Sequence, residues 1–227
     1  MDESNKNKII IDLCAGTGSW SRPYKEAGYN VISVTLPDND VRTYQLPENI
    51  YGILAAPPCT QFSNARTNAK TPRDLRGGME IVKACLNLIW DAQYRISSDQ
   101  SKRSPLKFWA LENPWYGRLE WFLGNPNFVF DPWEFGDQYK KRTALWGYFN
   151  KPIKTHTVIS NVLTQKQIEK QKTNSQKLPK FDSLLMSELK ELKGVNNPAC
   201  SMPFQLRQTL RAITPAKFAR AFFDSNR

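Results

Sequence analysis

Apolar positions along the chain alternate between short β-branched runs and stretches with helical spacing. Ile9-Ile10-Ile11 is followed by a glycine-containing turn, which predicts a buried strand. Residues 78–94 place apolar side chains at Met79, Val82, Leu86 and Ile89, as on one helix face. Further strands are predicted at residues 31–36, 52–56, 108–111 and 143–149, and further helices at residues 21–28 and 215–223. This alternation predicts an α/β fold, with a mostly parallel sheet covered on both faces.

Residues whose side chains can bind a ligand or take part in a reaction follow the predicted strands. Asp12, Asp40, Cys59 and Glu112 are each expected just past the carboxyl end of a strand. Ligands of open α/β sheets bind at that edge. The sequence therefore predicts that these residues gather at one edge of the sheet.

The composition changes after residue 150. Residues 151–193 contain nine Lys, no Arg and four acidic residues, a net charge of +5, with few apolar residues. Two compatible interpretations remain, a solvated insertion and an element that faces nucleic acid. We expect one catalytic domain, formed by residues 1–150 and 201–227, with residues 151–200 as a small basic insertion.

Overall composition narrows the function classes. The 227 residues carry 32 Lys and Arg against 21 Asp and Glu, a net charge of +11, which favours a nucleic-acid partner over a merely soluble basic surface. No apolar run approaches the roughly 20 residues of a membrane span, and the polar start has no signal core, so we expect a cytoplasmic protein without membrane contact. One His and four scattered Cys without a CxxC pair disfavour metal centres, disulfide frameworks and His-dependent hydrolases.

Two segments have the composition of ligand-binding or reactive loops. Residues 12–19 (DLCAGTGS) leave a strand and open a helix; such a turn exposes backbone N–H groups to a ligand, or uses glycine for geometry alone. Cys59 follows two prolines, which favours a reactive cysteine on a stiff loop, whereas Cys85 is expected within an apolar helix face. Basic residues after Cys59 would stabilise a thiolate or hold phosphates: Arg66, Lys70, Arg73 and Arg76.

Two further segments carry charged side chains at strand ends. Glu112-Asn113-Pro114 either caps a turn or supplies a general acid beside a nucleophilic cysteine. Lys140 and Arg142, two residues apart at the start of a strand, should point to the same face. Such a pair can grip a phosphate, or orient a carboxylate and a base edge.

The segments DLCAGTGSW, APPCTQFS, ENP and QYKKR, in this order, resemble the successive signature motifs of DNA cytosine-5 methyltransferases. The resemblance covers about residues 9–149 and resumes at residues 211–215 (RAITP). ENPxG and KRTxLWGxF are similar to the short phage and prophage members, which suggests a phage origin and a setting such as restriction-modification. The resemblance implies a Rossmann-like S-adenosylmethionine-dependent methyltransferase fold. It also implies a monomer that methylates carbon 5 of a cytosine flipped out of DNA.

The resemblance also implies residue roles. Cys59 matches the nucleophile that adds to carbon 6 of cytosine, Glu112 the residue that protonates ring nitrogen 3, and Arg142 the arginine that holds the base oxygen and orients the glutamate. The implied S-adenosylmethionine site comprises Asp12, Cys14, Ala15, Gly16, Gly18, Ser19, Trp20, Asp38, Asp40, Val41, Pro58 and Thr214. The DNA-binding residues expected are Ser63, Arg66, Arg73, Lys140, Lys166 and Lys170.

The chain departs from the family pattern at four places. Cys14 stands where Phe is usual, Leu36 where a Glu binds the ribose, and Lys140 where the first Arg of QxRxR stands; ENP replaces ENV. Asp38 is a substitute candidate for the ribose-binding Glu. Three alternatives therefore stay open: a catalytically weak or inactive DNA-binding relative, an enzyme acting on RNA or free nucleotides, and a modified S-adenosylmethionine donor bound near Arg211.

Overall fold

The computed structural model describes residues 3–64, 66, 69–94, 106–158 and 212–227. Lys166 and Lys170, like most of the predicted insertion, lie outside these residues. Within the described part of the chain, no helix has both the length and the apolar character needed to cross a membrane.

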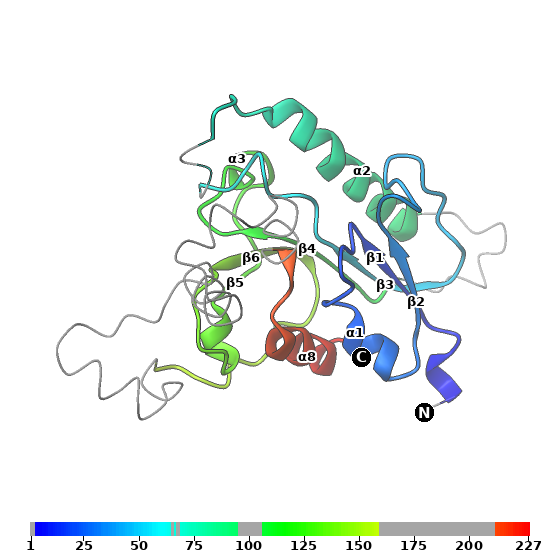
Figure 1. Cartoon of the computed structure of the whole chain (residues 1–227). Helices are drawn as coiled ribbons and strands as arrows, with labels where there is room; N and C mark the ends of the chain where they lie inside the picture. Colours follow the sequence, from blue (N-terminus) through cyan, green and yellow to red (C-terminus); the bar gives the residue numbers. More distant parts are fainter. Residues whose placement is uncertain (1–2, 65, 67–68, 95–105, 159–211) are drawn as a thin grey trace, which may run out of the picture.

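A six-stranded sheet forms the centre of the molecule, in the order β2-β1-β3-β4-β6-β5 (Figure 1). The first four strands are parallel, β6 is antiparallel to β4, and β5 is antiparallel to β6. The strands are β1 (Ile9–Leu13), β2 (Asn30–Val34), β3 (Ile50–Ala55), β4 (Phe108–Pro114), β5 (Phe128–Phe130) and β6 (Thr143–Tyr148). The fold is thus mixed α/β with a mostly parallel sheet, compatible with a Rossmann-like fold, which confirms the expectation at this level.

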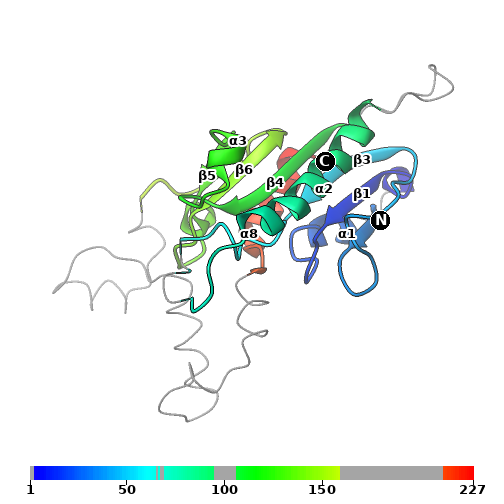
Figure 2. The ribbon, with the colours of Figure 1, turned by 90° about the horizontal axis from the view of Figure 1, so that it is seen from above.

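Helices cover both faces of the sheet (Figures 1 and 2). Helix α2 (Leu75–Tyr94) lies on one face and buries Val82, Cys85, Leu88 and Ile89. The other face carries α1 (Arg22–Glu26) and α8 (Ala216–Ser225). Ile11 packs with the core under α2, and its neighbour Ile10 with the core under α8, because successive side chains of a strand point to opposite faces.

Helix α8 closes the second core with aromatic rings. Phe218 stacks on Phe130 of β5, with centroids 3.8 Å apart, and Phe222 meets the ring of Trp20 edge-on at 5.4 Å. Such ring pairs add to the free energy gained by burying the rings. Helix α8 thereby packs the loop after β1 and the edge strand β5 into the same hydrophobic core.

The strand ends differ from the sequence prediction. β4 continues to Pro114, so Glu112 lies within a strand, and Asp12 lies within β1; the prediction that both follow a strand was wrong. β2 ends at Val34, and Leu36 beyond it is 68% exposed. These strands end where their hydrogen-bonded pairing to neighbouring strands ends, and that pairing cannot be seen in the sequence. Short elements were missed, as expected for runs without a period: β5, α3 (Glu120–Leu123), and the 3₁₀ helices η1 (Glu3–Asn5) and η3 (Pro132–Phe135).

Residues near the two ends of the undescribed segment 159–211 meet at Gly136. Its φ is +99°, and a Cβ there would lie 3.1 Å from His156 Cε1 and 3.2 Å from Lys217 Nζ. Lys217 Nζ donates a hydrogen bond of 2.7 Å to the Gly136 carbonyl oxygen. His156 and Lys217 therefore lie beside each other on the core.

Candidate active site

The carboxyl ends of β1 and β3 lie side by side where the strand order reverses. The chain passes from β1 to β2 on one side, and from β3 to β4 on the other. The Ala56 N–H donates to the Leu13 carbonyl (2.9 Å), and the Cys14 N–H to the Val34 carbonyl (2.8 Å). Ligands of open α/β sheets bind at this reversal, and the loops after β1 and β3 both open there.

The loop after β1 has three left-handed residues. The φ angles are +57° at Cys14, +54° at Gly16 and +65° at Gly18. Glycine adopts this conformation freely, whereas a cysteine rarely does. A Cβ at Gly16 would meet no atom within 4 Å, so the loop backbone is open to a ligand at that position. The half-buried Cys14 instead places its sulfur 4.0 Å from that of buried Cys85.

Asp12 anchors the loop after β1 through a hydrogen bond with Ser21. The Ser21 hydroxyl donates a 2.5 Å hydrogen bond to Asp12 Oδ2, and both residues are buried. Burial raises the pKa of Asp12 to about 7, and the Ser21 hydrogen bond partly opposes that rise. Asp12 therefore acts on the loop through Ser21 and does not present its carboxylate to solvent.

The loop after β2 presents its acidic residues differently from the sequence expectation. Asp40 accepts hydrogen bonds from Arg42 Nε (2.9 and 3.0 Å) and from the Arg42 backbone N–H (3.0 Å), which lower the pKa of Asp40 to about 2. The Asp40 carboxylate is thus already bonded to an exposed guanidinium. Asp38 is exposed and remains accessible to a ligand.

Two expected cofactor residues are packing residues in this structure. Trp20 is 2% exposed against α8, and Val41 is buried in the core under α2. Among the described residues, the indole N–H of Trp20 has no hydrogen-bond partner. A ligand at the sheet edge would therefore meet these residues only through their backbone.

Cys59 begins a helical turn after β3. The Phe62 and Ser63 N–H groups both donate to the Cys59 carbonyl, at 2.9 and 2.8 Å. Phe62 is fully buried and anchors the turn, while Pro57 before it is buried and Pro58 exposed. Cys59 and Ser63 are half-buried, so the turn holds both at the molecular surface.

A buried asparagine joins the turn to the neighbouring strand. Asn113 Nδ2 donates a 3.0 Å hydrogen bond to the carbonyl oxygen of Pro57. Its neighbour Glu112 is partly buried, and burial raises the pKa of Glu112 while the charge of Lys141 partly offsets that rise. The structure thus brings the segments of Cys59 and Glu112 together, as the sequence predicted.

Because β6 runs antiparallel to β4, Lys140 and Arg142 just before β6 lie at the same sheet edge as the end of β4. The Trp115 N–H after β4 donates to the Arg142 carbonyl just before β6 (3.0 Å). Lys140 and Arg142 both lower the pKa of Asp131, against a larger rise from burial, in keeping with side chains on a shared face. The positive charge that acts on Glu112 belongs to Lys141 instead. Sequence reasoning missed Lys141, since Arg142 was the residue expected to orient Glu112.

Register explains this difference. Glu112 lies opposite Leu145, so alternate residues Thr143 and Lys141 continue on its face. Arg142 is exposed, and its guanidinium lies 5.6 Å over the ring of Tyr116. Counting outward from Leu145 would have identified Lys141, but only once β6 was known to be antiparallel to β4.

Arginines surround the turn of Cys59. Arg66 Nη1 donates to the Gln61 side-chain oxygen (2.7 Å), and Arg73 Nη1 to the Gln61 carbonyl (2.8 Å). The Arg118 N–H donates to the Phe62 carbonyl (2.9 Å). Burial, Arg118 and Arg66 lower the pKa of Arg73, which shows that these guanidinium groups are close to one another. The cluster concentrates positive charge beside the turn of Cys59, and the expected DNA contacts of Arg66 and Arg73 stay a prediction.

The segment before α8 bridges the loop after β1 and the start of β6. The Thr214 N–H donates to Ser19 Oγ, and Lys141 Nζ donates to the Ile213 carbonyl, both at 2.8 Å. Thr214 therefore lies against the glycine loop, and its implied part in cofactor binding stays a prediction.

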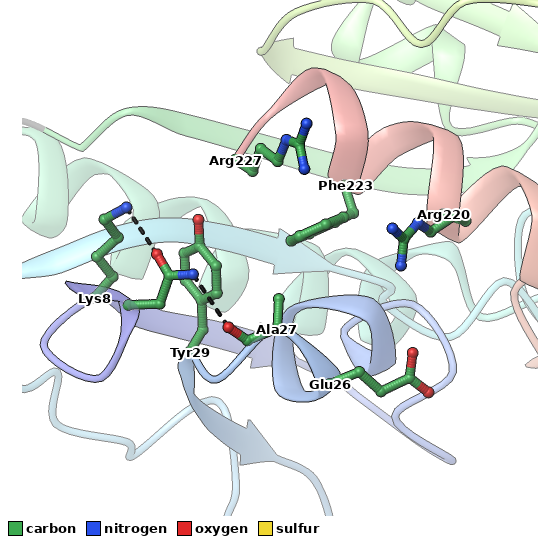
Figure 3. Close-up of a pocket in the computed structure, with 8 residues that line it drawn as sticks. Lys8, Glu26, Ala27, Tyr29, Arg220, Phe223 and Arg227 are labelled. Atoms are coloured by element: carbon green, nitrogen blue, oxygen red, sulfur yellow. Dashed lines mark hydrogen bonds between the residues drawn. The ribbon is translucent and has the colours of Figure 1, made fainter. Parts of the chain in front are cut away.

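A cavity of about 530 Å³ lies apart from the sheet edge that carries Cys59 and Glu112; Figure 3 shows the residues that line it. Lys8 and Tyr29 in its wall precede β1 and β2, so it opens at the amino ends of the parallel strands. Its lining residues are Asn5, Lys8, Glu26, Ala27, Tyr29, Arg220, Phe223 and Arg227. None of the residues predicted from sequence to bind or react lines it.

Comparison with known proteins found no matching family model and no matching curated protein. Among the described residues, no group of three or more His, Cys, Asp or Glu side chains is placed to hold a metal ion. The function of the sheet edge is therefore inferred from its own residues and motifs.

Proposed function

We propose that the chain is a DNA (cytosine-5)-methyltransferase with a Rossmann-like methyltransferase domain. It would transfer a methyl group from S-adenosylmethionine to carbon 5 of a cytosine flipped out of DNA. The observation that carries the proposal is the Asn113–Pro57 hydrogen bond of 3.0 Å. It joins the segment of a candidate nucleophile, Cys59, to the segment of a candidate proton donor, Glu112.

These two residues supply the chemistry that cytosine requires. The Cys59 thiolate gives its electron pair to carbon 6, and the π electrons of the carbon 5–carbon 6 bond move toward carbon 5 and ring nitrogen 3. Protonated Glu112 donates its proton to nitrogen 3. The raised pKa of Glu112 supports this role, because it keeps more of the carboxyl protonated before addition. Carbon 5 would then carry the electron pair that takes up the cofactor's methyl group. The carbon 5 proton passes to solvent, its bonding pair reforms the carbon 5–carbon 6 double bond, and the carbon 6–sulfur pair leaves with the Cys59 thiolate. The nitrogen 3 proton returns to the Glu112 carboxylate.

The loop after β1 fits S-adenosylmethionine. Gly16 is exposed with no atom within 4 Å of its Cβ position, and Gly18 is left-handed, so the backbone can approach a ligand closely. The hydrogen bond from the Thr214 N–H to Ser19 Oγ ties this loop to the segment before α8. When bound, the cofactor would supply an electrophilic methyl group on its sulfonium sulfur. Asp38 is an accessible carboxylate for its polar groups.

DNA fits the charge around the turn of Cys59. Carbon 6 of a stacked cytosine is inaccessible in a duplex, so the base must leave the helix. Arg66, Arg73 and Arg118 form a positive cluster around the turn, and such groups neutralise phosphates. The net charge of +11 supports the same partner.

Covalent trapping tests the proposal. An oligodeoxynucleotide containing 5-fluorocytosine cannot lose fluorine from carbon 5, so the purified protein with S-adenosylmethionine should form an adduct stable to denaturing electrophoresis. Cys59→Ser should bind the oligonucleotide and form no adduct, because a hydroxyl has too high a pKa to add. Cys85→Ala is the matched control and should form the adduct. An adduct with Cys59→Ser, or none with the wild type, would contradict the proposal.

The Asp40–Arg42 pairing favours one second candidate, a DNA-binding relative without methyl transfer. Arg42 occupies the carboxylate that the family resemblance assigns to the adenine amino group. Isothermal titration with S-adenosylmethionine separates the two functions: the methyltransferase binds it, and the second candidate does not. Arg42→Ala should strengthen binding if Asp40 faces the cofactor.

A further inference from the structure

Large apolar rings are exposed beside the turn of Cys59. Tyr116 is 58% exposed, and Trp121 and Phe122 in α3 are 65% and 48% exposed. Single exposed apolar residues are common on protein surfaces, but neighbouring ones mark binding surfaces. We call Tyr116, Arg118, Trp121 and Arg142 the aromatic–arginine surface.

This surface is continuous with the candidate nucleophile segment. The Arg118 N–H donates to the Phe62 carbonyl (2.9 Å), and the side-chain amide of Asn64 donates to the Tyr116 carbonyl. The buried ring of Phe62 contacts that of Phe122 edge-on, with centroids 6.5 Å apart. A ligand on the surface would therefore extend to the turn that begins at Cys59.

Two of these three exposed rings, Tyr116 and Trp121, have a guanidinium beside them. Arg142 lies 5.6 Å over the Tyr116 ring, and Arg118 lies 5.0 Å over the Trp121 ring. Within the described part of the chain, neither arginine forms an ion pair. The surface thus combines flat apolar faces with positive charge that no carboxylate of the described residues neutralises by direct contact.

The backbone of Tyr116 shows that its ring is not explained by the turn. Its φ is +62°, a left-handed conformation that is strained for a bulky side chain and free for glycine. Turn geometry alone would favour glycine at this position. Placing an aromatic ring there costs conformational strain, and the ring stays 58% exposed although it contacts the neighbouring Trp115 ring, with centroids 5.3 Å apart.

We infer that the aromatic–arginine surface stacks unpaired DNA bases. The chain would therefore bind single-stranded DNA more tightly than duplex DNA. Aromatic rings stack on any base, and arginine neutralises the adjoining phosphates. A duplex offers no base face for stacking, because its bases already stack on each other. The inference rests on the proposed function only in taking DNA as the ligand.

Fluorescence anisotropy with a labelled oligodeoxynucleotide of about 12 nucleotides, single-stranded or annealed, tests this inference without cofactor. Tyr116→Ala and Trp121→Ala should each weaken single-strand binding by about five-fold to 100-fold and duplex binding much less. Matched controls are Tyr148→Ala, 68% exposed at the opposite end of β6 from Arg142, and Trp90→Ala, 56% exposed on α2. Both controls should bind as the wild type does.

Tyr116→Gly separates binding from folding. It should unfold at the same temperature as the wild type or a higher one, since it relieves the left-handed strain, and still lose single-strand affinity. The inference is overturned if Tyr116→Ala and Trp121→Ala weaken both forms of DNA alike, or bind as the controls do. Tighter binding of single-stranded RNA than of DNA would overturn the choice of ligand.

The trapping experiment keeps this inference distinct from the proposed function. If the adduct at Cys59 forms but the ring variants bind single strands normally, the inference fails and the methyltransferase proposal stands. If the ring variants lose single-strand binding but no adduct forms, the surface binds DNA and the proposed reaction fails.

Discussion

The side-chain amide of Asn113 donates a hydrogen bond of 3.0 Å to the carbonyl oxygen of Pro57. Asn113 is fully buried and lies in β4, whereas Pro57 lies in the loop that follows β3. Two neighbouring strands thus share one polar contact at the sheet edge. This contact sets the position of the loop that carries Cys59 relative to Glu112, and its removal has a measurable consequence.

Asn113→Ala should destabilise the protein by about 1–3 kcal/mol, since it leaves the buried Pro57 carbonyl without its donor. It should also slow adduct formation on 5-fluorocytosine DNA, because the loop of Cys59 loses its tie to β4. Denaturant unfolding and the trapping rate measure the two effects. Asn87→Ala, on the exposed side of α2, should change neither. Wild-type stability in Asn113→Ala would show that the contact does not hold the loop.

Asp12 should make stability fall as pH rises. Its pKa rises from 3.8 to about 7 on folding, so between these values the folded protein holds a proton that the unfolded chain has released. The contribution of Asp12 to stability is then greatest below about pH 4 and decreases until about pH 7, by up to about 4 kcal/mol.

Asp12→Asn tests this dependence, because the amide oxygen can still accept from Ser21 and carries no ionisable group. Thermal unfolding at pH 5 and pH 8 should show a smaller decrease for the variant than for the wild type. An unchanged decrease would mean that Asp12 is not the group responsible.

Lys141 should set the alkaline limit of the reaction. Proton donation to the base requires protonated Glu112, so activity should decline as pH rises through the pKa of Glu112. The charge of Lys141 lowers that pKa, so Lys141→Met should raise it and shift the decline to higher pH. Lys141→Arg keeps the charge and should keep the wild-type limit. Trapping rates across pH measure this shift; movement to lower pH would refute the coupling.

The Lys-rich segment should contribute to DNA affinity through its charge. Lys166, Lys170 and Lys172 lie outside the described residues, and each neutralised phosphate adds about 0.9 to the slope of log affinity against log salt. Replacing all three with Ala should flatten the slope by up to roughly 3, equally for all sequences. Anisotropy titrations from low to moderate salt measure it, with Arg22→Gln in α1 as control. An unchanged slope would assign phosphate binding to the arginines around Cys59.

Strands and helices with a clear hydrophobic period could be predicted from the sequence. Ile9-Ile10-Ile11 gave β1, and the spacing from Met79 to Ile89 gave α2, because each pattern reports burial of its own residues. The order of motifs at strand ends also placed Cys59, Glu112 and the glycine loop at one sheet edge. The elements could be predicted because they depend on local sequence, and the shared edge could be predicted because β1, β3 and β4 are parallel.

Properties set by distant contacts could not be predicted. Lys141 faces Glu112 because β6 runs antiparallel to β4, a direction that the sequence does not encode locally. Trp20 is buried because α8, almost 200 residues later, packs its Phe222 against the indole. Whether an aromatic residue beside a motif faces a ligand or a core therefore depends on which remote element covers it.

The meeting of His156 and Lys217 at Gly136 brings the two flanks of residues 159–211 together on the core. The points where the chain leaves the core and returns to it are adjacent, so the core supports both ends of a segment whose length can vary. Closing a loop costs only about 0.6 kcal/mol more for each doubling of its length. Segments of quite different size could therefore be exchanged at this point without altering the sheet. Under the proposed function, the scaffold would acquire new DNA preferences by substitution of a single contiguous stretch.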